Sequence, residues 1–254
     1  MNFEYTGNWS FSSLLDYEAC PMRFRLKRID KIPEPPRPPD NPLERGTRIH
    51  DHLDAYTAGR VDSLDGIEAK RIAPFVPMLD HLRELRECGM ATGERDWLFD
   101  RDWNVTQKDW GPAEDRGDIP PGMKSSGKPI WLWAKLDVSV CSPAQSLVIT
   151  GDYKSGKSAY KTIEHIQQTQ LYAAVSALRY DWADHHSTEL YYVDEGWTKP
   201  VTYTREQALA FVGRFDQRAQ RIYDDRYFRP NPSKVTCKWC PHSPRGTGAC
   251  PVGV

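Results

Sequence analysis

The feature that most constrains the fold is a pair of apolar segments joined by a very short connection. Residues 130–140 (IWLWAKLDVSV) and 146–154 (SLVITGDYK) are rich in β-branched and aromatic side chains, which are typical of strands. The SPAQ segment between them, residues 142–145, has room only for a turn. Such a connection joins antiparallel strands, because parallel strands need a long crossover. The sequence therefore predicts a hairpin.

The hairpin brings two acids and a lysine to one place. The expected turn sets Asp137 opposite Thr150, and residues that face each other across a strand pair share one face of the sheet. Alternation puts Asp152 and Lys154 on that same face. Buried carboxylates this close repel one another unless a cation neutralises them, and Mg²⁺ or Mn²⁺ prefers such oxygen ligands. A slip of the register by one residue would send Asp137 to the opposite face, so this prediction depends on the turn.

The same strand end also matches a different motif. Residues 151–158 read GDYKSGKS, the pattern of a phosphate-binding loop, and LYYVDE at 190–195 resembles the strand and acid that hold magnesium in ATPases. However, the Asp152 carboxylate would repel a polyphosphate. The chain after Ser158 offers one clear strand, which is too few for a parallel ATPase sheet. A P-loop ATPase is kept as an alternative.

The surrounding segments predict a mixed α/β fold. Hydrophobic spacing and capping residues indicate helices, with Ser10 or Ser12 at the first N-terminus and Thr204 at the last. The expected helices cover residues 10–28, 43–58, 66–88, 160–180 and the segment from Thr204 onward. The other expected elements are strands at 94–105 and 188–195, a proline-rich extended segment at 31–42 and a loop at 106–128. Because strands follow one another without intervening helices, an all-parallel sheet is disfavoured.

Charge and hydropathy exclude few classes of protein. The formal net charge is −1, so composition alone does not indicate a nucleic-acid-binding chain, although local basic patches are present. No apolar run approaches the roughly 20 residues of a membrane span, and the N-terminus lacks the features of a signal peptide. We therefore expect a cytoplasmic protein without a membrane partner. The candidate DNA-binding residues in the basic patches are Arg23, Arg25, Lys27, Arg28, Lys157 and Lys161.

The helix expected after the hairpin completes a longer pattern. Gln168 and Tyr172 are four residues apart and therefore share one face of that helix. Asp137, the DYK run at 152–154 and this Gln-x-x-x-Tyr pair together resemble the RecB-type nucleases of the PD-(D/E)xK superfamily.

The resemblance implies a restriction-endonuclease-like core of αβββαβ type and a role for each matched residue. Asp137 and Asp152 would hold Mg²⁺ or Mn²⁺ together with His50 from an upstream helix, where His52 is the competitor. Lys154 would be the catalytic lysine. The glutamine and the tyrosine of the later helix would support the site or contact DNA.

Cysteines gather near the end of the chain. Cys237, Cys240 and Cys250 include a C-x-x-C pair, a spacing that zinc and iron–sulfur sites both use, and Cys20 is the candidate fourth ligand. A distant N-terminal cysteine followed by three C-terminal ones resembles the iron–sulfur nucleases related to RecB, namely AddB-type domains and CRISPR-associated RecB-like exonucleases. That resemblance implies a structural 4Fe–4S cluster tying the two ends of the sequence together. A structural Zn²⁺ on the same ligands, with His242 as a substitute, stays an alternative.

These expectations divide the chain into three parts. Residues 1–42 form a helical cap with the first cysteine and the proline-rich strap, residues 43–228 the nuclease core, and residues 229–254 the cysteine segment that closes the cluster. The expected activity is metal-dependent hydrolysis of DNA by an exonuclease on single-stranded ends, in repair, recombination, phage DNA processing or CRISPR adaptation. Its partner would be a helicase, a recombinase or a CRISPR integrase. A DNA-binding accessory protein without catalysis, with a zinc site, is the second alternative.

Overall fold

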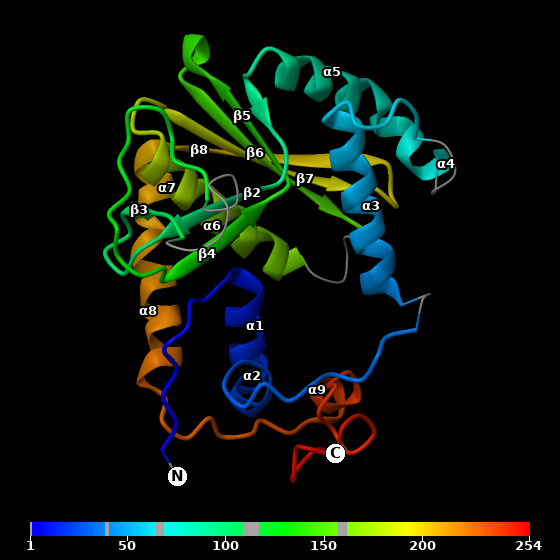
Figure 1. Ribbon diagram of the computed structural model, residues 1–254, viewed down its shortest axis with the longest axis vertical. Coiled ribbons are helices and arrows are strands. Elements are labelled where there is room, and N and C mark those ends of the chain that lie inside the picture. The colour runs from blue at the N-terminus through cyan, green and yellow to red at the C-terminus, as the bar shows by residue number, and fades with distance from the viewer. Residues whose placement is uncertain (1, 39–40, 65–68, 109–116, 157–161) are drawn as a thin grey trace. The chain divides into compact units, whose positions relative to one another are not determined.

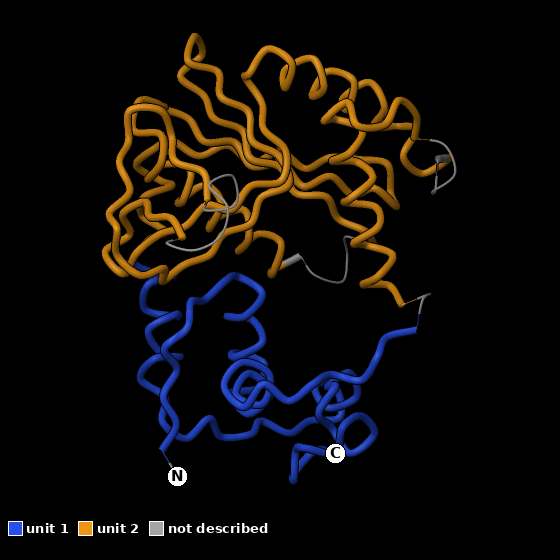
Figure 2. Tube along the Cα trace, in the orientation of Figure 1, with its two compact units in different colours: residues 1–38, 213–254 blue, residues 39–212 orange. Residues whose placement is uncertain are grey.

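The computed structural model describes residues 2–38, 41–64, 69–108, 117–156 and 162–254. The chain divides into two units (Figure 2). The larger unit contains residues 39–212, and the smaller unit combines residues 1–38 with 213–254. No helix in the described ranges is long and apolar enough to cross a membrane.

The larger unit is built on a five-stranded mixed sheet with the strand order β1-β5-β6-β7-β8 (Figure 1). Strands β6 and β7 are parallel, with helix α6 (Thr162–Arg179) between them in the sequence, whereas the other neighbours are antiparallel. The strands are β1 (Ala91–Thr92), β5 (Val138–Ser142), β6 (Leu147–Lys154), β7 (His185–Tyr192) and β8 (Trp197–Thr204). The prediction of a mixed α/β fold is confirmed.

The predicted hairpin forms, but its first strand is divided at Asp137. Residues before the break form β4 (Leu132–Leu136), which pairs with β2 (Arg95–Phe99) in a separate three-stranded sheet completed by β3 (Val105–Thr106). Residues after the break form β5, which pairs with β6. One apolar segment therefore contributes to two sheets, and the first candidate acid lies at the junction.

The register of β5 and β6 differs from the prediction by two residues, because Thr150 faces Ser139 and not Asp137. The reason lies in the turn. Pro143–Gln145 form a short 3-10 helix, and Ser146 adopts a left-handed conformation with a φ of 50°. The connection thus closes one residue later than expected. Because side chains alternate with a period of two, a shift by two residues leaves the acids on the predicted face.

The sequence does not predict strand β8. Strand β7 begins three residues earlier than expected, at His185, and the chain then turns back to form β8 along its side. Pro200 lies within β8, and proline is unfavourable inside a sheet, so the sequence pattern hides this strand. The proline is tolerated because β8 is the last strand of the sheet, where one side needs no hydrogen-bond partner.

Helices complete the larger unit. Helix α3 buries Ile49 and Leu53 in an apolar cluster that includes side chains of β5, β6 and α5. His50 follows Ile49 directly, so this packing fixes where the histidine lies. Prolines divide the described part of the predicted helix 66–88, as expected. The helices and the 3-10 helix η1 are α3 (Pro42–Thr57), α4 (Ala69–Ile72), η1 (Ala73–Phe75), α5 (Val76–Glu87), α6 and α7 (Arg205–Ala210).

The smaller unit combines helices from distant parts of the sequence. They are α1 (Phe11–Ala19), α2 (Pro21–Arg28), α8 (Val212–Asp224, which enters this unit at Gly213) and α9 (Lys234–Lys238). An aromatic group forms part of its core, in which the ring of Phe24 contacts those of Tyr5, Tyr17 and Phe228.

Two predicted helices are interrupted near their middle. The helix expected over residues 10–28 ends at Cys20, because Pro21 has no N–H for the helix ladder and begins α2 instead. Its cap at Ser10 is confirmed. The helix expected from Thr204 begins there with the predicted capping box, but it is divided at Phe211 into α7 and α8.

Candidate active site

Two buried aspartates come together where β4, β5 and β6 meet. Asp137 lies at the break between β4 and β5, and Asp152 lies near the end of β6, with 9% and 7% of their surface exposed. Strand pairing sets Val138 opposite Gly151, so the two acids occupy the next positions along the two chains. Asp137 Oδ2 also accepts a 2.7 Å hydrogen bond from the backbone N–H of Tyr153. The backbone of β6 therefore holds the first acid beside the second.

Helix α6 contributes a glutamine and a tyrosine that orient Asp152. The side-chain amide of Gln168 donates hydrogen bonds to Asp152 Oδ1 at 2.9 Å and to the Tyr172 hydroxyl at 2.8 Å. That hydroxyl lies 3.0 Å from the same carboxylate oxygen and 2.9 Å from the carbonyl oxygen of Lys135. Burial raises the pKa of Tyr172 well above its usual value, so the hydroxyl keeps a proton to donate.

Lys154 completes the network from the strand. Its ammonium donates a 2.7 Å hydrogen bond to the side-chain carbonyl oxygen of Gln168 and forms an ion pair with Asp152 Oδ2. Apart from this ion pair, Asp152 Oδ2 is buried without a hydrogen-bond partner in the described part of the chain. Gln168 thus bridges the acid and the lysine, with its NH₂ group on one and its carbonyl oxygen on the other.

His50 reaches the site from helix α3. Its Nδ1 lies 3.2 Å from Asp137 Oδ2, and its ring packs edge-on against Tyr153. Burial alone would lower the pKa of His50, but the hydrogen bond and the charge of Asp137 raise it above the usual value. Burial and the charge of Asp152 raise the pKa of Asp137, and the contact with His50 opposes that shift. The two acids therefore repel each other, and a positive charge at this place stabilises both.

The site opens into a cleft of about 390 Å³, which is lined by residues of α3, β4 and β6 and by Glu94. His50 lines this cleft, whereas its competitor His52 does not. Helix α3 approaches the end of β6 closely here, because a side chain at Gly46 would come within 2.9 Å of the Ser155 hydroxyl. Lys135 also lines the cleft and was not predicted. Alternation along its strand, two residues before Asp137, is the signal that could have found it.

A second polar network holds α3 against the segment that follows β6. Asp194, just after β7, accepts two hydrogen bonds from the Arg45 guanidinium at 2.5 and 2.9 Å and one from the backbone N–H of Gly156 at 2.8 Å. The Arg45 hydrogen bond holds the pKa of the Asp194 carboxyl below its usual value. This carboxylate therefore links the helix that carries His50 to the chain just after Lys154.

The strand geometry also bears on the phosphate-loop motif. Residues 151–154 lie in β6 and pair with β7, Gly151 also pairs with β5, and the Tyr153 N–H is bonded to Asp137, so these amides are not gathered around a phosphate. The first half of GDYKSGKS is therefore strand and not loop. The candidate DNA-binding residues Lys157 and Lys161 lie outside the described residues.

The four predicted cluster cysteines line one small cavity in the smaller unit. Cys20, Cys237, Cys240 and Cys250 surround a volume of about 20 Å³, and none of them forms a disulfide. Cys20 lies at the break between α1 and α2, where its sulfur accepts a hydrogen bond from the backbone N–H of Asn231 at 3.4 Å. Burial raises the pKa of the Cys240 thiol.

The residue types of both sites suit the metals that the sequence resemblance implies, but the side chains as placed do not form complete sets of metal ligands. Within the described ranges, no three His, Cys, Asp or Glu side chains form a group that could hold a metal ion as they stand. The acids of the larger unit instead contact His50 and Lys154 directly. By chemistry, two carboxylates with an imidazole fit Mg²⁺ or Mn²⁺, and four thiols fit an iron–sulfur cluster or zinc.

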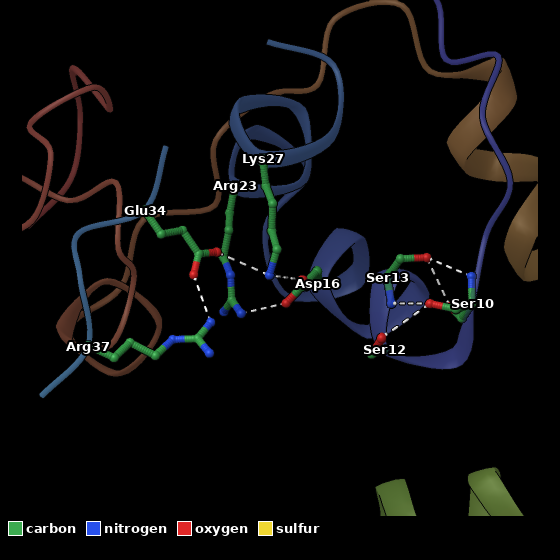
Figure 3. A network of polar contacts seen from close by, with 8 residues as sticks. All are labelled: Ser10, Ser12, Ser13, Asp16, Arg23, Lys27, Glu34 and Arg37. Atoms are coloured by element: carbon green, nitrogen blue, oxygen red, sulfur yellow. Dashed lines mark hydrogen bonds and ion pairs between the residues drawn. The ribbon is translucent and has the colours of Figure 1, made fainter. Parts of the chain in front are cut away.

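Three of the four residues in the predicted basic patch of the smaller unit form ion pairs with other described residues, and Figure 3 shows those of Arg23 and Lys27. The residues of the patch are Arg23, Arg25, Lys27 and Arg28, all on helix α2. Asp16 contacts Arg23 at 2.5 Å and Lys27 at 3.4 Å, and Glu34 contacts Lys27 at 3.1 Å. Arg25 forms an ion pair with Asp30 at 3.0 Å. The patch therefore carries less available positive charge than its sequence suggests.

A match to a known family decides the assignment. The family model described as the PD-(D/E)XK nuclease superfamily matches residues 8–245. The chain belongs to the PD-(D/E)XK nuclease superfamily. Its nucleases typically use Mg²⁺ or Mn²⁺ and bind DNA, so this chain is a metal-dependent nuclease. The succession α5, β1, β5, β6, α6, β7 agrees with the αβββαβ order of the restriction-endonuclease-like fold, and both observations argue against a P-loop ATPase.

Other comparisons are less informative. No protein of curated function matches the chain. A solved structure described as "Crystal structure of SSO0001" is similar at 13% sequence identity, over 99% of this chain and 89% of that chain, with a TM-score of 0.40. A likeness at this level carries no information on activity.

Proposed function

We propose that this nuclease is a DNA exonuclease that hydrolyses phosphodiester bonds from single-stranded ends, with a structural 4Fe–4S cluster in its smaller unit. The observation that carries the nuclease site is the continuous set of contacts from Lys154 through Gln168 to Asp152, beside Asp137. These are the residue types that the superfamily motif requires, on two paired strands and one helix. The exonuclease mode and the cluster are supported by the sequence resemblance.

The acids and the histidine would hold the divalent ion. Asp137, Asp152 and His50 present two carboxylates and one imidazole, a donor set that Mg²⁺ and especially Mn²⁺ accept. When bound, such an ion supplies Lewis acidity at the scissile phosphate. The protein's part is to fix the ligands, because Gln168 and Tyr172 hold one carboxylate and the backbone of β6 holds the other.

Lys154 supplies a fixed positive charge beside the acids. Its ammonium is held by Asp152 and Gln168, so it is already in place before DNA arrives. A cation at this position stabilises the negative charge that develops on the phosphate and can orient the attacking water. Tyr172 acts one step away by fixing the Asp152 carboxylate oxygen.

The cluster and the biological setting belong to the same proposal. The four thiols around one cavity support a 4Fe–4S cluster that joins α1 and α2 to the C-terminal segment, with zinc as the alternative occupant. DNA repair, recombination, phage DNA processing and CRISPR adaptation all supply DNA ends. A helicase, recombinase or CRISPR integrase partner would present such an end to this nuclease.

Cleavage of DNA with and without ends tests the proposal. The substrates are end-labelled linear single strands, linear duplex and circular single strands, each with Mg²⁺ or Mn²⁺. We expect the protein to degrade linear single strands and to leave circles intact. Lys154→Ala should slow cleavage by at least about 10²-fold, because it removes a fixed charge from the site. Lys128→Ala is the matched control, since Lys128 is exposed and pairs with Asp102 away from the cleft.

Two outcomes would contradict the proposal. If the protein cut circular single strands as fast as linear ones, it would be an endonuclease and not an exonuclease. Full activity of Lys154→Ala would remove the proposed catalytic site.

A further inference from the structure

A groove lies beside the catalytic cleft, over the three-stranded sheet of the larger unit. It has a volume of about 950 Å³, and its walls come from β2, β4, residues 107–108 after β3, and residues 117–119. Glu94 and Lys135 line both this groove and the catalytic cleft, so the two are adjacent, with this pair of side chains between them. A substrate that occupies the cleft reaches the groove over β4 by passing this exposed ion pair.

Strand β4 presents two side chains along this route. Its residues alternate between buried and less buried, and the less buried positions are the half-buried Trp133 and the exposed Lys135. Asp137 is two residues beyond Lys135, so the same alternation leads from the tryptophan through the lysine to the first acid. At about 3.3 Å per residue, Trp133 is ~13 Å from Asp137 along the chain. The spacing matches a ligand that extends past the cleft by one or two nucleotide units.

The indole of Trp133 is fixed before any ligand binds. The ammonium of Lys108 lies 4.3 Å from the centre of a Trp133 ring, in a cation–π contact. Lys108 is itself anchored by Asp96 at 2.9 Å. A partly exposed, pre-positioned aromatic ring in a polar groove is the arrangement that proteins use to stack single-stranded bases.

Lys135 offers a positive charge that a ligand can take over. Its ammonium lies 2.8 Å from Glu94, and their side chains are 57% and 39% exposed. An ion pair exposed to this extent is weak, so a phosphate can replace the carboxylate at little cost. An aromatic surface next to an exchangeable ammonium fits one base and its adjoining phosphate.

The same chemistry discriminates between single strands and duplex. A base can stack on a protein ring only if one of its faces is free, and inside a duplex the neighbouring base pairs cover both faces, so that only a terminal pair offers one. We propose that this groove binds unpaired nucleotides next to the scissile phosphate, with Trp133 stacking on a base and Lys135 contacting a phosphate. The inference rests on the proposed nuclease function and deepens it, because it assigns the preference for single strands to Trp133.

Binding measurements on a cleavage-deficient protein test the inference. In a Lys154→Ala background with Mg²⁺, fluorescence anisotropy would compare a labelled single strand with a labelled closed circular duplex of the same sequence, which has no terminal base pair. Trp133→Ala should weaken single-strand binding by about 5- to 150-fold, the range expected for losing one stacked base. Binding of the circular duplex should change by less than about twofold, because none of its bases has a free face. Trp133→Phe should regain most of the single-strand affinity.

Trp197→Ala is the matched control. Trp197 is 40% exposed in the same unit, stacks on Tyr192, and lines neither the groove nor the cleft. Its variant should bind single strands like the parent. Unchanged single-strand affinity of Trp133→Ala would overturn the inference, and so would an equal loss for duplex. A Trp133→Phe variant that folds normally but binds as weakly as Trp133→Ala would also overturn it.

A positional probe separates stacking from a general effect on folding. A single strand carrying 2-aminopurine at successive positions should lose fluorescence at one position near the scissile phosphate, and Trp133→Ala should restore it. Uniform quenching along the strand, or quenching that survives Trp133→Ala, would contradict the stacking role. Binding and quenching do not require turnover. A protein that cleaves no DNA would thus refute the proposed function while this measurement still decides the groove.

Discussion

The nuclease site of the larger unit and the cysteine site of the smaller unit are held together in different ways. In the nuclease site, direct hydrogen bonds and an ion pair join the strand residues Asp152 and Lys154 to Gln168 on a helix. In the cysteine site, the four sulfurs share a cavity, but they come from a helix break at Cys20 and from a segment more than 200 residues later. Paired strands fix the first site, whereas in our proposal the second is held together by the cluster that the cysteines bind.

This difference predicts which property of the protein, activity or stability, a substitution in each site should change. Strand pairing aligns side chains through many backbone hydrogen bonds, so loss of one polar group should leave the fold intact and reduce activity. A cluster of thiolates that closes a long loop contributes its binding free energy to folding. The first site should therefore fail in catalysis, and the second in stability.

The largest expected effect concerns the side chain that bridges acid and lysine. Gln168→Leu keeps a similar shape but removes the hydrogen bonds to Asp152 and Lys154. We expect cleavage to slow by about 10²-fold, as for other misplacements of catalytic groups, with a melting temperature near that of the parent. Single-turnover cleavage and thermal unfolding measure the two quantities. Gln145→Leu, in the exposed turn before β6, is the control.

A Gln168→Leu variant with normal cleavage would show that the site does not depend on this bridge. A large fall in its melting temperature with an unchanged cleavage rate per folded molecule would show that Gln168 serves stability, as the cysteines do. The proposed difference between the two sites would then be wrong.

The next effect concerns the cysteine site. Cys237→Ser should lose the visible absorbance and the iron of anaerobically purified protein, and lower the melting temperature by roughly 10 °C, because several kcal/mol of ligand binding are lost. Cys88→Ser is the control, since Cys88 is exposed and outside the cavity. Metal and sulfide analysis with calorimetry gives both readouts. Colourless protein with stoichiometric zinc would favour the zinc alternative, and an unchanged melting temperature would refute a structural role.

A smaller expected effect is the pH dependence of the stability of the larger unit, which does not involve the cysteines. His186 is fully buried in β7, with Nδ1 2.8 Å from the Ser176 hydroxyl, and burial lowers its pKa from 6.5 to about 4. The unfolded chain therefore binds a proton more readily than the folded one between these values. Stability should be complete above pH 6.5 and decline as the pH falls towards 4.

The variant His186→Asn should flatten that decline, and His185→Asn, on the exposed neighbour, should not. Urea unfolding at several pH values measures the effect. A parent protein whose unfolding free energy does not fall between pH 6.5 and 4 would contradict the assignment of this shift to His186.

Much of the arrangement at the proposed catalytic site was predictable because short-range rules set it. The period of two along a strand puts Asp152 and Lys154 on one face, and the spacing of four along a helix does the same for Gln168 and Tyr172. The packing of α6 on the sheet then brings the two pairs into contact. The turn after β5 was predicted one residue too early. The resulting shift between the paired strands is two residues, so Asp137 still lies on the predicted face of the sheet.

Other features depend on the fold as a whole. The division of one apolar segment into β4 and β5 follows from pairing with two different sheets, which no local pattern reports. Strand β8 is hidden by Pro200, which is acceptable only at the edge of a sheet. Asp194 and its Arg45 partner are far apart in sequence, so their contact follows only from the packing of α3. The groove of Trp133 likewise exists only once β2 and β4 are paired.

The most direct test of the central claim is a metal titration of one aspartate variant. Cleavage of end-labelled single strands and calorimetric binding of Mn²⁺ would be measured for the parent and for Asp152→Asn, which keeps the shape of the side chain but removes its charge. We predict that the parent binds Mn²⁺, cleaves only with a divalent ion and stops when the ion is chelated, whereas Asp152→Asn loses both binding and cleavage. Parental cleavage by Asp152→Asn would contradict the account.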